Sequence, residues 1–214
     1  MRVLIACECS GVVRDAFLAL GHDAWSCDKK PTQVPGPHLK CDVREVLYGD
    51  WDLLIAHPVC RYLANSGSKH LYLDKKRGSS IDPERWKSMC EAADFFKMFD
   101  QAKHIKKRCV ENPIMHVHAL RRIGRPATQY VQPHFFGDPF KKATGLWLTN
   151  LIPLRRTHWP TSYPPGTVFT QEVLNMSPSP DREEKRSETY PCLAKAMALQ
   201  WGGVISKKRS RVRI

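Results

Sequence analysis

The sequence feature that most constrains the fold is an alternation of short apolar runs with segments of helical spacing. The run DLLIA at residues 52–56 is the clearest buried strand, and apolar residues recur at helical spacing over 12–21. Asp82 and Pro83 suit the N-cap and first position of a helix over 82–99. The alternation predicts an α/β fold with a mostly parallel sheet and helices on both faces. The expected strands are 3–7, 22–28, 38–42, 52–56, 105–112, 128–133 and 143–150, and the other expected helices are 43–49 and 188–203.

Polar residues follow the apolar runs, at the points where the expected strands end. In open parallel sheets, ligands bind beyond the carboxyl ends of the strands. We therefore expect these side chains to share one crevice. They are Glu8, Ser10 and Gly11 after the first strand, Asp28 and Asp42 after the next two, Pro58 and Cys60 after the fourth, and Glu111 and Asn112 after the fifth.

The charge of the chain indicates the kind of partner. A formal net charge of +13 and a pI near 9.5 favour a partner that carries phosphates. Basic residues gather over 103–108 and over 207–213, and no long amphipathic helix carries them, so nucleic acid is favoured over an anionic membrane surface. A solvated surface with a disordered tail is the alternative explanation.

The length and the hydropathy pattern suggest one domain. The 214 residues suit a single domain over 1–203, followed by a basic tail over 204–214. The sequence contains no apolar run of about 18 residues, and its start lacks the features of a signal peptide. We expect a cytoplasmic protein with no membrane partner. The oligomeric state is left open.

The cysteines and histidines do not suggest a metal site or a disulfide framework. Eight cysteines are present and none forms a CxxC pair. His57, His116 and His118 are candidate metal ligands, because His116 and His118 resemble a ligand pair, but no third ligand stands at a helpful spacing, so no metal is expected.

Two residues carry the strongest chemical signals. Cys60 lies on a loop directly after a buried strand, where Arg61, Lys69 and a helix end are expected to lower its pKa and make it a nucleophile. Glu111 ends an apolar strand, where burial is expected to raise its pKa and make it a proton donor. An incidental loop cysteine and a first-turn helix acid are the alternative explanations.

Taken together, these segments resemble the two catalytic motifs of DNA cytosine-5 methyltransferases. The family's Pro-Pro-Cys motif is matched by Pro58-Val59-Cys60, with Ser66-Gly67 further on, and its Glu-Asn-Val motif by Glu111-Asn112-Pro113. The resemblance implies a Rossmann-like class I methyltransferase fold. It is closest to the short members that phage genomes carry, so the expected setting is a bacterium or a phage-infected host cell.

The resemblance also implies the cofactor and the substrate contacts. S-adenosylmethionine is expected to bind at Glu8, Ser10, Gly11 and Pro58, with Asp28 at its ribose and Asp42 near its adenine. Cys60 is expected to add to carbon 6 of cytosine, Glu111 to bind the ring, and Asn112 to orient the loops around Cys60. DNA is expected to contact Arg61, Ser66, Lys141, Lys142, Lys207, Lys208 and Arg209. The family's sequence-specific members carry a separate target-recognition domain, for which this chain has no room, so weak sequence specificity is expected.

Other functions stay open on the sequence alone. One is a non-catalytic nucleic-acid-binding protein that keeps the fold, which the departures at Val59 and Arg61 would suit. The substrate could also be a free cytosine nucleotide, or the transferred group something other than plain methyl. A nuclease is a weaker alternative, because Asp28, Asp50 and Asp52 do not converge into a metal site.

Overall fold

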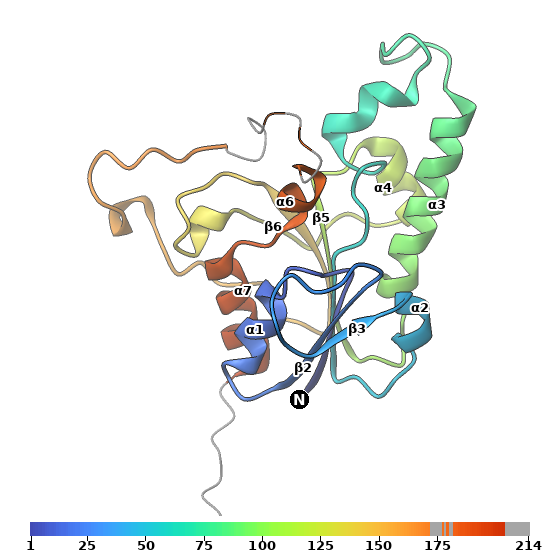
Figure 1. Ribbon diagram of the computed structural model, residues 1–214. Coiled ribbons are helices and arrows are strands. Elements are labelled where there is room, and N and C mark those ends of the chain that lie inside the picture. Colours follow the sequence, from blue (N-terminus) through green and yellow to red (C-terminus); the bar gives the residue numbers. More distant parts are fainter. Residues whose placement is uncertain (172–176, 178, 180–181, 204–214) are drawn as a thin grey trace, which may run out of the picture.

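The structure, a computed structural model, describes residues 1–171, 177, 179 and 182–203. Within these residues one sheet has the strand order β3-β2-β1-β4-β5-β7-β6 (Figure 1). Strands β1 to β5 are parallel, and β7 runs antiparallel to both β5 and β6. The strands are β1 (Arg2–Ala6), β2 (Asp23–Asp28), β3 (His38–Lys40), β4 (Leu53–Ala56), β5 (Lys107–Pro113), β6 (Gln129–Val131) and β7 (Thr144–Thr149).

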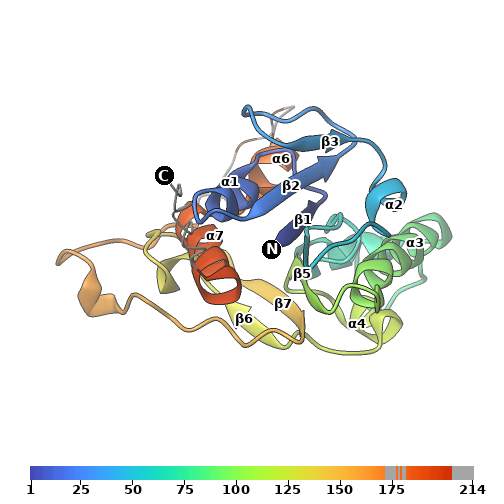
Figure 2. The ribbon, with the colours of Figure 1, turned by 90° about the horizontal axis from the view of Figure 1, so that it is seen from below.

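Helices cover both faces of the sheet (Figures 1 and 2). Helices α1 (Val12–Leu18) and α7 (Pro191–Met197) lie on one face, and α2 (Val43–Val46), α3 (Pro83–Asp100) and α4 (Val117–Ile123) lie on the other. The remaining helical segments are α6 (Arg182–Ser187), the 3₁₀ turns η1 (Asn65–Leu71), η2 (Pro133–Phe135) and η3 (Pro160–Ser162), and a π-helical turn η4 (Ala198–Gly202) that continues α7.

The alternation of side chains along the strands builds the two halves of the core. In β1, Val3 packs with Phe17 of α1 and Met197 of α7, whereas Leu4 packs with Phe96 of α3 on the opposite face. None of these five side chains has any exposed surface. Burying a side chain of this size stabilises a fold by about 1.5–3 kcal/mol. The central strands are therefore apolar on both faces, as a parallel sheet between two helix layers requires.

The start of α3 has the predicted chemistry. The Asp82 carboxylate accepts hydrogen bonds from the backbone N–H groups of Glu84 and Arg85, and Pro83 occupies the first turn. Two N–H groups without a partner inside the helix are satisfied in this way. The predicted helix is confirmed and ends one residue later than expected, at Asp100.

The structure differs from the sequence prediction at several places. Helix α1 ends at Leu18 rather than at Gly21, which has φ 84° in the turn that follows. Helix α4 was not predicted: the His116 side chain caps its start and Gly124, with φ 92°, ends it. The segment 60–80, expected to be a loop, contains η1, and the irregular segment 151–187 contains η3 and α6. The closing helix begins at Pro191 instead of 188.

The predicted fold class is confirmed by the strand order and the pairing. The sheet is mostly parallel with helices on both faces, and the single reversed strand β7 is inserted between β5 and β6, which gives the Rossmann-like class I methyltransferase fold. No helix in the described part of the chain is long and apolar enough to cross a membrane. The basic tail over 204–214 lies outside the described residues.

Candidate active site at the carboxyl edge of the sheet

A cavity of about 450 Å³ opens at the carboxyl ends of β1, β2, β4 and β5. Parallel strands end at the same edge, so residues far apart in the sequence meet there. We call this the carboxyl-edge cavity. Eight residues expected at a site line it: Glu8, Ser10, Asp28, Pro58, Cys60, Glu111, Asn112 and Lys142. The predicted shared crevice therefore holds for seven of these residues, and Lys142, which was expected to contact DNA, lines the same cavity.

Cys60 is a half-buried free thiol in the wall of this cavity. Burial raises the pKa of the thiol, and the negative charge of Glu111 raises it further, while Lys142 and Arg186 act in the opposite direction. The expectation that the surroundings lower this pKa is wrong, because burial outweighs the cations. Arg61 and Lys69, the cations expected to act, are exposed to solvent and outside the cavity lining.

Glu111 is buried in β5 and is paired with His57. Its Oε2 lies 2.9 Å from His57 Nδ1, and the two side chains are 10% and 8% exposed, respectively. Burial raises the pKa of Glu111, but the hydrogen bond and charge of His57, the charge of Lys142 and a hydrogen bond with Thr144 together lower it below its usual value. The expectation of a raised pKa is therefore wrong: the partners of the carboxyl outweigh its desolvation.

Asn112 connects β5 to the loop that carries Cys60. Its Nδ2 donates a hydrogen bond of 3.0 Å to the carbonyl oxygen of Pro58, two residues before the thiol. The Oδ1 atom is buried and has no hydrogen-bond partner among the described residues. The predicted role of Asn112, to orient the Cys60 loop, requires a contact of this kind.

The polar groups of the turn after β1 form hydrogen bonds with the start of helix α1. Glu8 is buried, and its carboxylate accepts hydrogen bonds from the backbone N–H groups of Val13 and Arg14 and from the Ser10 hydroxyl. Gly11 has φ 79° and lies outside the cavity lining. A Cβ atom there would approach the Arg14 guanidinium to 2.5 Å. This glycine is thus required by a left-handed turn and by close packing on Arg14.

The two acids after β2 and β3 lie in different surroundings. Asp28 lines the cavity, and its Oδ1 accepts a hydrogen bond from the backbone N–H of Lys30. Asp42 does not line the cavity. It caps α2 in a capping box with Glu45 and forms an ion pair of 3.0 Å with Lys29. The structure thus places Asp28, and not Asp42, where it can contact a ligand in this cavity.

Lys142 and residues 186–189 also line the carboxyl-edge cavity. Lys142 Nζ donates a hydrogen bond of 2.8 Å to the Glu188 carbonyl oxygen and lies 5.8 Å from the centre of the Tyr190 ring. Burial lowers the pKa of Lys142, while Glu111 and Cys60 raise it. Sequence reasoning considered His57 only as a metal ligand and missed both its pairing with Glu111 and the segment 186–189, because nothing local in the sequence marks these contacts.

The remaining predicted contact residues lie elsewhere. Arg61, Ser66 and Lys141 are exposed and outside the cavity lining. The tail residues Lys207, Lys208 and Arg209 lie outside the described residues. The described part of the chain contains no group of three or more His, Cys, Asp or Glu side chains that could hold a metal ion.

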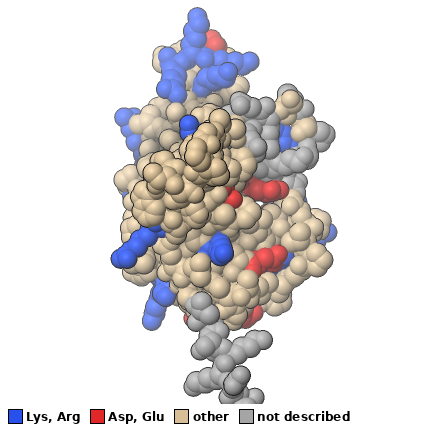
Figure 3. Space-filling view, turned by 90° about the vertical axis from the view of Figure 1, so that its left-hand side faces the viewer, with Lys and Arg blue, Asp and Glu red and all other residues tan. Residues whose placement is uncertain are grey.

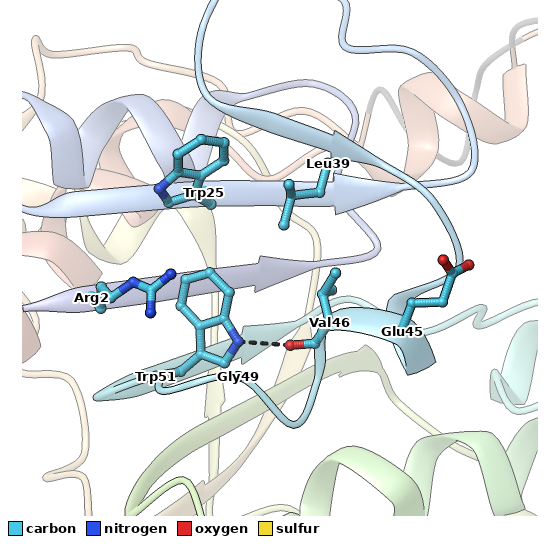
Figure 4. A pocket seen from close by; sticks show the side chains of 7 residues that line it. All are labelled: Arg2, Trp25, Leu39, Glu45, Val46, Gly49 and Trp51. Carbon is cyan, nitrogen blue, oxygen red and sulfur yellow. Dashed lines mark hydrogen bonds between the residues drawn. The ribbon is translucent and has the colours of Figure 1, made fainter.

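A second cavity, of about 290 Å³, lies near the amino ends of β1 and β4 (Figure 4). We call it the tryptophan cavity, because Trp25 and Trp51 line it together with Arg2. The indole of Trp25 donates a hydrogen bond to the Asp23 carboxylate, and that of Trp51 donates to the Val46 carbonyl oxygen.

Comparisons with known proteins add a likeness of fold. No protein-family model and no curated protein matches the chain. A DNA modification methyltransferase of an E. coli prophage is 11% identical over 69% of this chain and 46% of its own, with a TM-score of 0.42. The Entamoeba histolytica methyltransferase EhMeth is 15% identical over 73% and 55%, with a TM-score of 0.41. A mutant of Spodoptera frugiperda DNMT2 is 14% identical over 79% and 54%, with a TM-score of 0.33.

The chain spans about half the length of these three structures. At such identities and TM-scores the likeness carries no argument about activity. The fold assignment stands on the strand order and pairing of the sheet.

Proposed function

We propose that the protein transfers a methyl group from S-adenosylmethionine to carbon 5 of cytosine in DNA. One observation carries the proposal: the thiol of Cys60, the carboxyl of Glu111 and the ammonium of Lys142 line a single cavity, which also reaches the acid at the end of β2. A nucleophile, a group that binds the ring and a balancing cation are what this reaction needs from a protein.

Cys60 supplies the nucleophile. Its thiolate forms a bond to carbon 6 of the ring, and the electron pair of the ring's 5,6 double bond moves toward carbon 5, which becomes nucleophilic. The cations Lys142 and Arg186 stabilise the thiolate against burial and against the charge of Glu111. After transfer, loss of the proton from carbon 5 and departure of the thiolate restore the aromatic ring.

Glu111 supplies the group that binds the ring. Its lowered pKa makes it a carboxylate in the free site, so it accepts a hydrogen bond from the exocyclic amine and faces the ring nitrogen. Negative charge develops on the ring as the thiolate adds, so a proton at that nitrogen stabilises the addition product. Binding of the base is therefore expected to take up a proton.

The cavity has a donor and acceptor set that fits the cofactor. A volume of about 450 Å³ lies in the range of cofactor sites. Asp28 offers carboxylate oxygens to the ribose hydroxyls, and the buried Asn112 Oδ1 has no hydrogen-bond partner among the described residues, so it remains an acceptor for a ligand. When bound, S-adenosylmethionine supplies an electrophilic methyl group.

The surface offers a place for the DNA backbone. Lys69, Lys75, Lys76 and Arg77 are exposed in residues 69–77, which we call the basic turn. Figure 3 shows blue side chains gathered at the top of the molecule, the end at which the segment before α3 lies in Figure 1. The carboxyl edge of the sheet faces this end. Such a surface binds phosphates whatever the base sequence.

Backbone binding without base reading agrees with the rest of the chain. The described segment after β7, residues 150–171, forms one short 3₁₀ turn, η3, and a single β-bridge between Thr170 and Phe140. We propose weak sequence specificity, and extrusion of the base from the duplex into the carboxyl-edge cavity.

The test is label transfer. The protein is incubated with DNA and methyl-labelled S-adenosylmethionine, the DNA is digested, and modified deoxycytidine is sought by mass spectrometry. We expect labelled 5-methyldeoxycytidine with the natural protein and none with Cys60→Ser. Transfer that survives this substitution contradicts the role of Cys60. Cofactor and DNA binding without any transfer would favour a non-catalytic binding protein, and transfer only to free nucleotides would contradict the DNA substrate.

A further inference from the structure

His57 is joined to Glu111 by the register of the sheet. Ala56, the last residue of β4, pairs with Val110 of β5. The residues that follow these two, His57 and Glu111, are therefore neighbours as well. His57 Nδ1 lies 2.9 Å from Glu111 Oε2, and neither side chain is more than 10% exposed. A carboxylate buried to this degree needs hydrogen-bond donors to replace water. His57 is one of them.

The hydrogen bonds of His57 differ from those of a purely structural histidine. His116 uses both ring nitrogens on the backbone: Nε2 bonds to the Tyr62 carbonyl oxygen and Nδ1 accepts from the Ala119 N–H. His57 Nε2 is buried without a hydrogen-bond partner among the described residues. The hydrogen bond of His57 is therefore directed at the carboxyl that the proposed reaction uses, and not at holding a loop.

The pairing with Glu111 determines which ring nitrogen of His57 carries a hydrogen. A carboxylate only accepts hydrogen bonds, so Nδ1 donates and carries the hydrogen. Burial raises the pKa of Glu111, and the His57 hydrogen bond is the largest of the contributions that lower it. Among the described residues, Lys142, Cys60 and Cys109 are ionisable groups that also interact electrostatically with this carboxyl.

We propose that His57 is a positioning residue of the proposed reaction: its Nδ1 holds the Glu111 carboxylate in the orientation in which it meets the cytosine ring. The inference rests on the proposed function and adds the group that keeps Glu111 ionised and in place before the base arrives. Without this donor, the pKa of the Glu111 carboxyl rises and the carboxyl loses its fixed orientation.

Two substitutions of His57 separate this role from simple packing. In His57→Asn the amide nitrogen reaches the place of Nδ1, so the donor to Glu111 is kept. In His57→Leu the side chain has a similar size but lacks a donor. Thermal melting of both variants checks that they fold.

The first readout needs no activity. The Glu111 carboxyl carbon is followed by NMR against pH in protein labelled with ¹³C-glutamate, with Glu111→Gln to assign the signal. We expect the His57→Leu midpoint to lie above that of the natural protein, and the His57→Asn midpoint to stay close to it. Equal midpoints in all three proteins overturn the inference, whether or not the protein transfers methyl groups.

The second readout is label transfer. For His57→Leu we expect kcat to fall by about tenfold or more with an unchanged KM for S-adenosylmethionine, and for His57→Asn a kcat within about threefold of the natural value. Full transfer activity in His57→Leu overturns the positioning role while the proposed function stands. No transfer by the natural protein overturns the proposed function and the positioning role with it, even where the titration shows the coupling.

Discussion

The two cavities of this molecule differ in what lines them. The tryptophan cavity, about 290 Å³, is bounded by rings whose N–H groups have protein acceptors, with the Arg2 guanidinium 4.7 Å from the centre of the Trp51 ring. The carboxyl-edge cavity, about 450 Å³, holds a half-buried thiol, a buried carboxylate and a half-buried ammonium. Charges are expensive to bury, so a fold that keeps three ionisable groups together here bears a cost that packing alone does not explain. The tryptophan cavity needs no such explanation.

The largest expected effect concerns Glu111. Glu111→Gln keeps the shape of the side chain and an acceptor for His57 but removes the negative charge, so we expect the single-turnover transfer rate to fall by about 100-fold or more. The same charge raises the pKa of Cys60, so alkylation of this thiol by iodoacetamide is expected to become faster. An unchanged transfer rate, or slower alkylation, would show that the charge of Glu111 has no role in the reaction. The carboxyl-edge cavity would then not differ from the tryptophan cavity in function.

A smaller effect is expected from Lys142. Its charge lowers the pKa of Cys60, so Lys142→Met raises that pKa further. Activity increases with pH as the thiolate forms, and the rising limb of the pH–rate profile should therefore move to higher pH, with a loss of about tenfold at neutral pH, equivalent to about 1.4 kcal/mol. Lys141→Met is the matched control, because Lys141 is exposed and outside the cavity. Equal effects of the two substitutions contradict the account.

The basic turn is expected to determine how the affinity for DNA depends on salt. Replacing Lys69, Lys75 and Lys76 by Ala is expected to reduce the slope of log affinity against log salt by about 2–3 for duplex DNA, since each phosphate contact contributes about 0.9. The control replaces Lys103, Lys106 and Lys107, which lie at the amino end of β5, away from the cavity. Fluorescence anisotropy measures both. A larger change in the control variant would assign DNA to the other edge of the sheet.

The smallest expected effect on transfer is that of the tryptophan cavity. Trp51 is 9% exposed, so Trp51→Ala is expected to lower the free energy of unfolding by about 3 kcal/mol through the cavity it leaves. The affinity for S-adenosylmethionine should stay within about twofold, because no residue that lines this cavity also lines the carboxyl-edge cavity. Urea unfolding and calorimetric titration measure the two quantities, and a loss of cofactor affinity at preserved folding would show that both cavities bind ligands.

The sequence predicted the parts of the site that depend on strand ends. The residues after β1, β2, β4 and β5 meet because parallel strands end at one edge, and this rule needs only the order of the apolar runs. It placed Cys60 and Glu111 together, although they are 51 residues apart along the chain. The rule was insufficient for Asp42, which caps a helix, and for Gly11, whose turn packs on the buried Arg14.

What the sequence did not predict depends on contacts between distant segments. The pKa directions of Cys60 and Glu111 depend on burial and on His57 and Lys142, which no local pattern brings together. The basic run over 103–108 suggested a nucleic-acid surface. However, Arg108 is buried and donates to backbone carbonyl oxygens of Asp100 and Ile105. Lys103 and Lys106 of the same run are exposed but lie at the amino end of β5, away from the carboxyl-edge cavity, and this placement is a property of the folded chain.

The most direct test of the account is to trap the proposed covalent bond. DNA with 5-fluorodeoxycytidine keeps fluorine at carbon 5 after transfer, so the thiol cannot leave and the adduct persists. With S-adenosylmethionine present, we predict a protein–DNA adduct whose peptide map places the nucleotide on Cys60. Cys7 and Cys9 also line the cavity and serve as internal controls. An adduct on either of them, or methyl transfer to ordinary DNA without any adduct on the fluorinated DNA, would contradict the account.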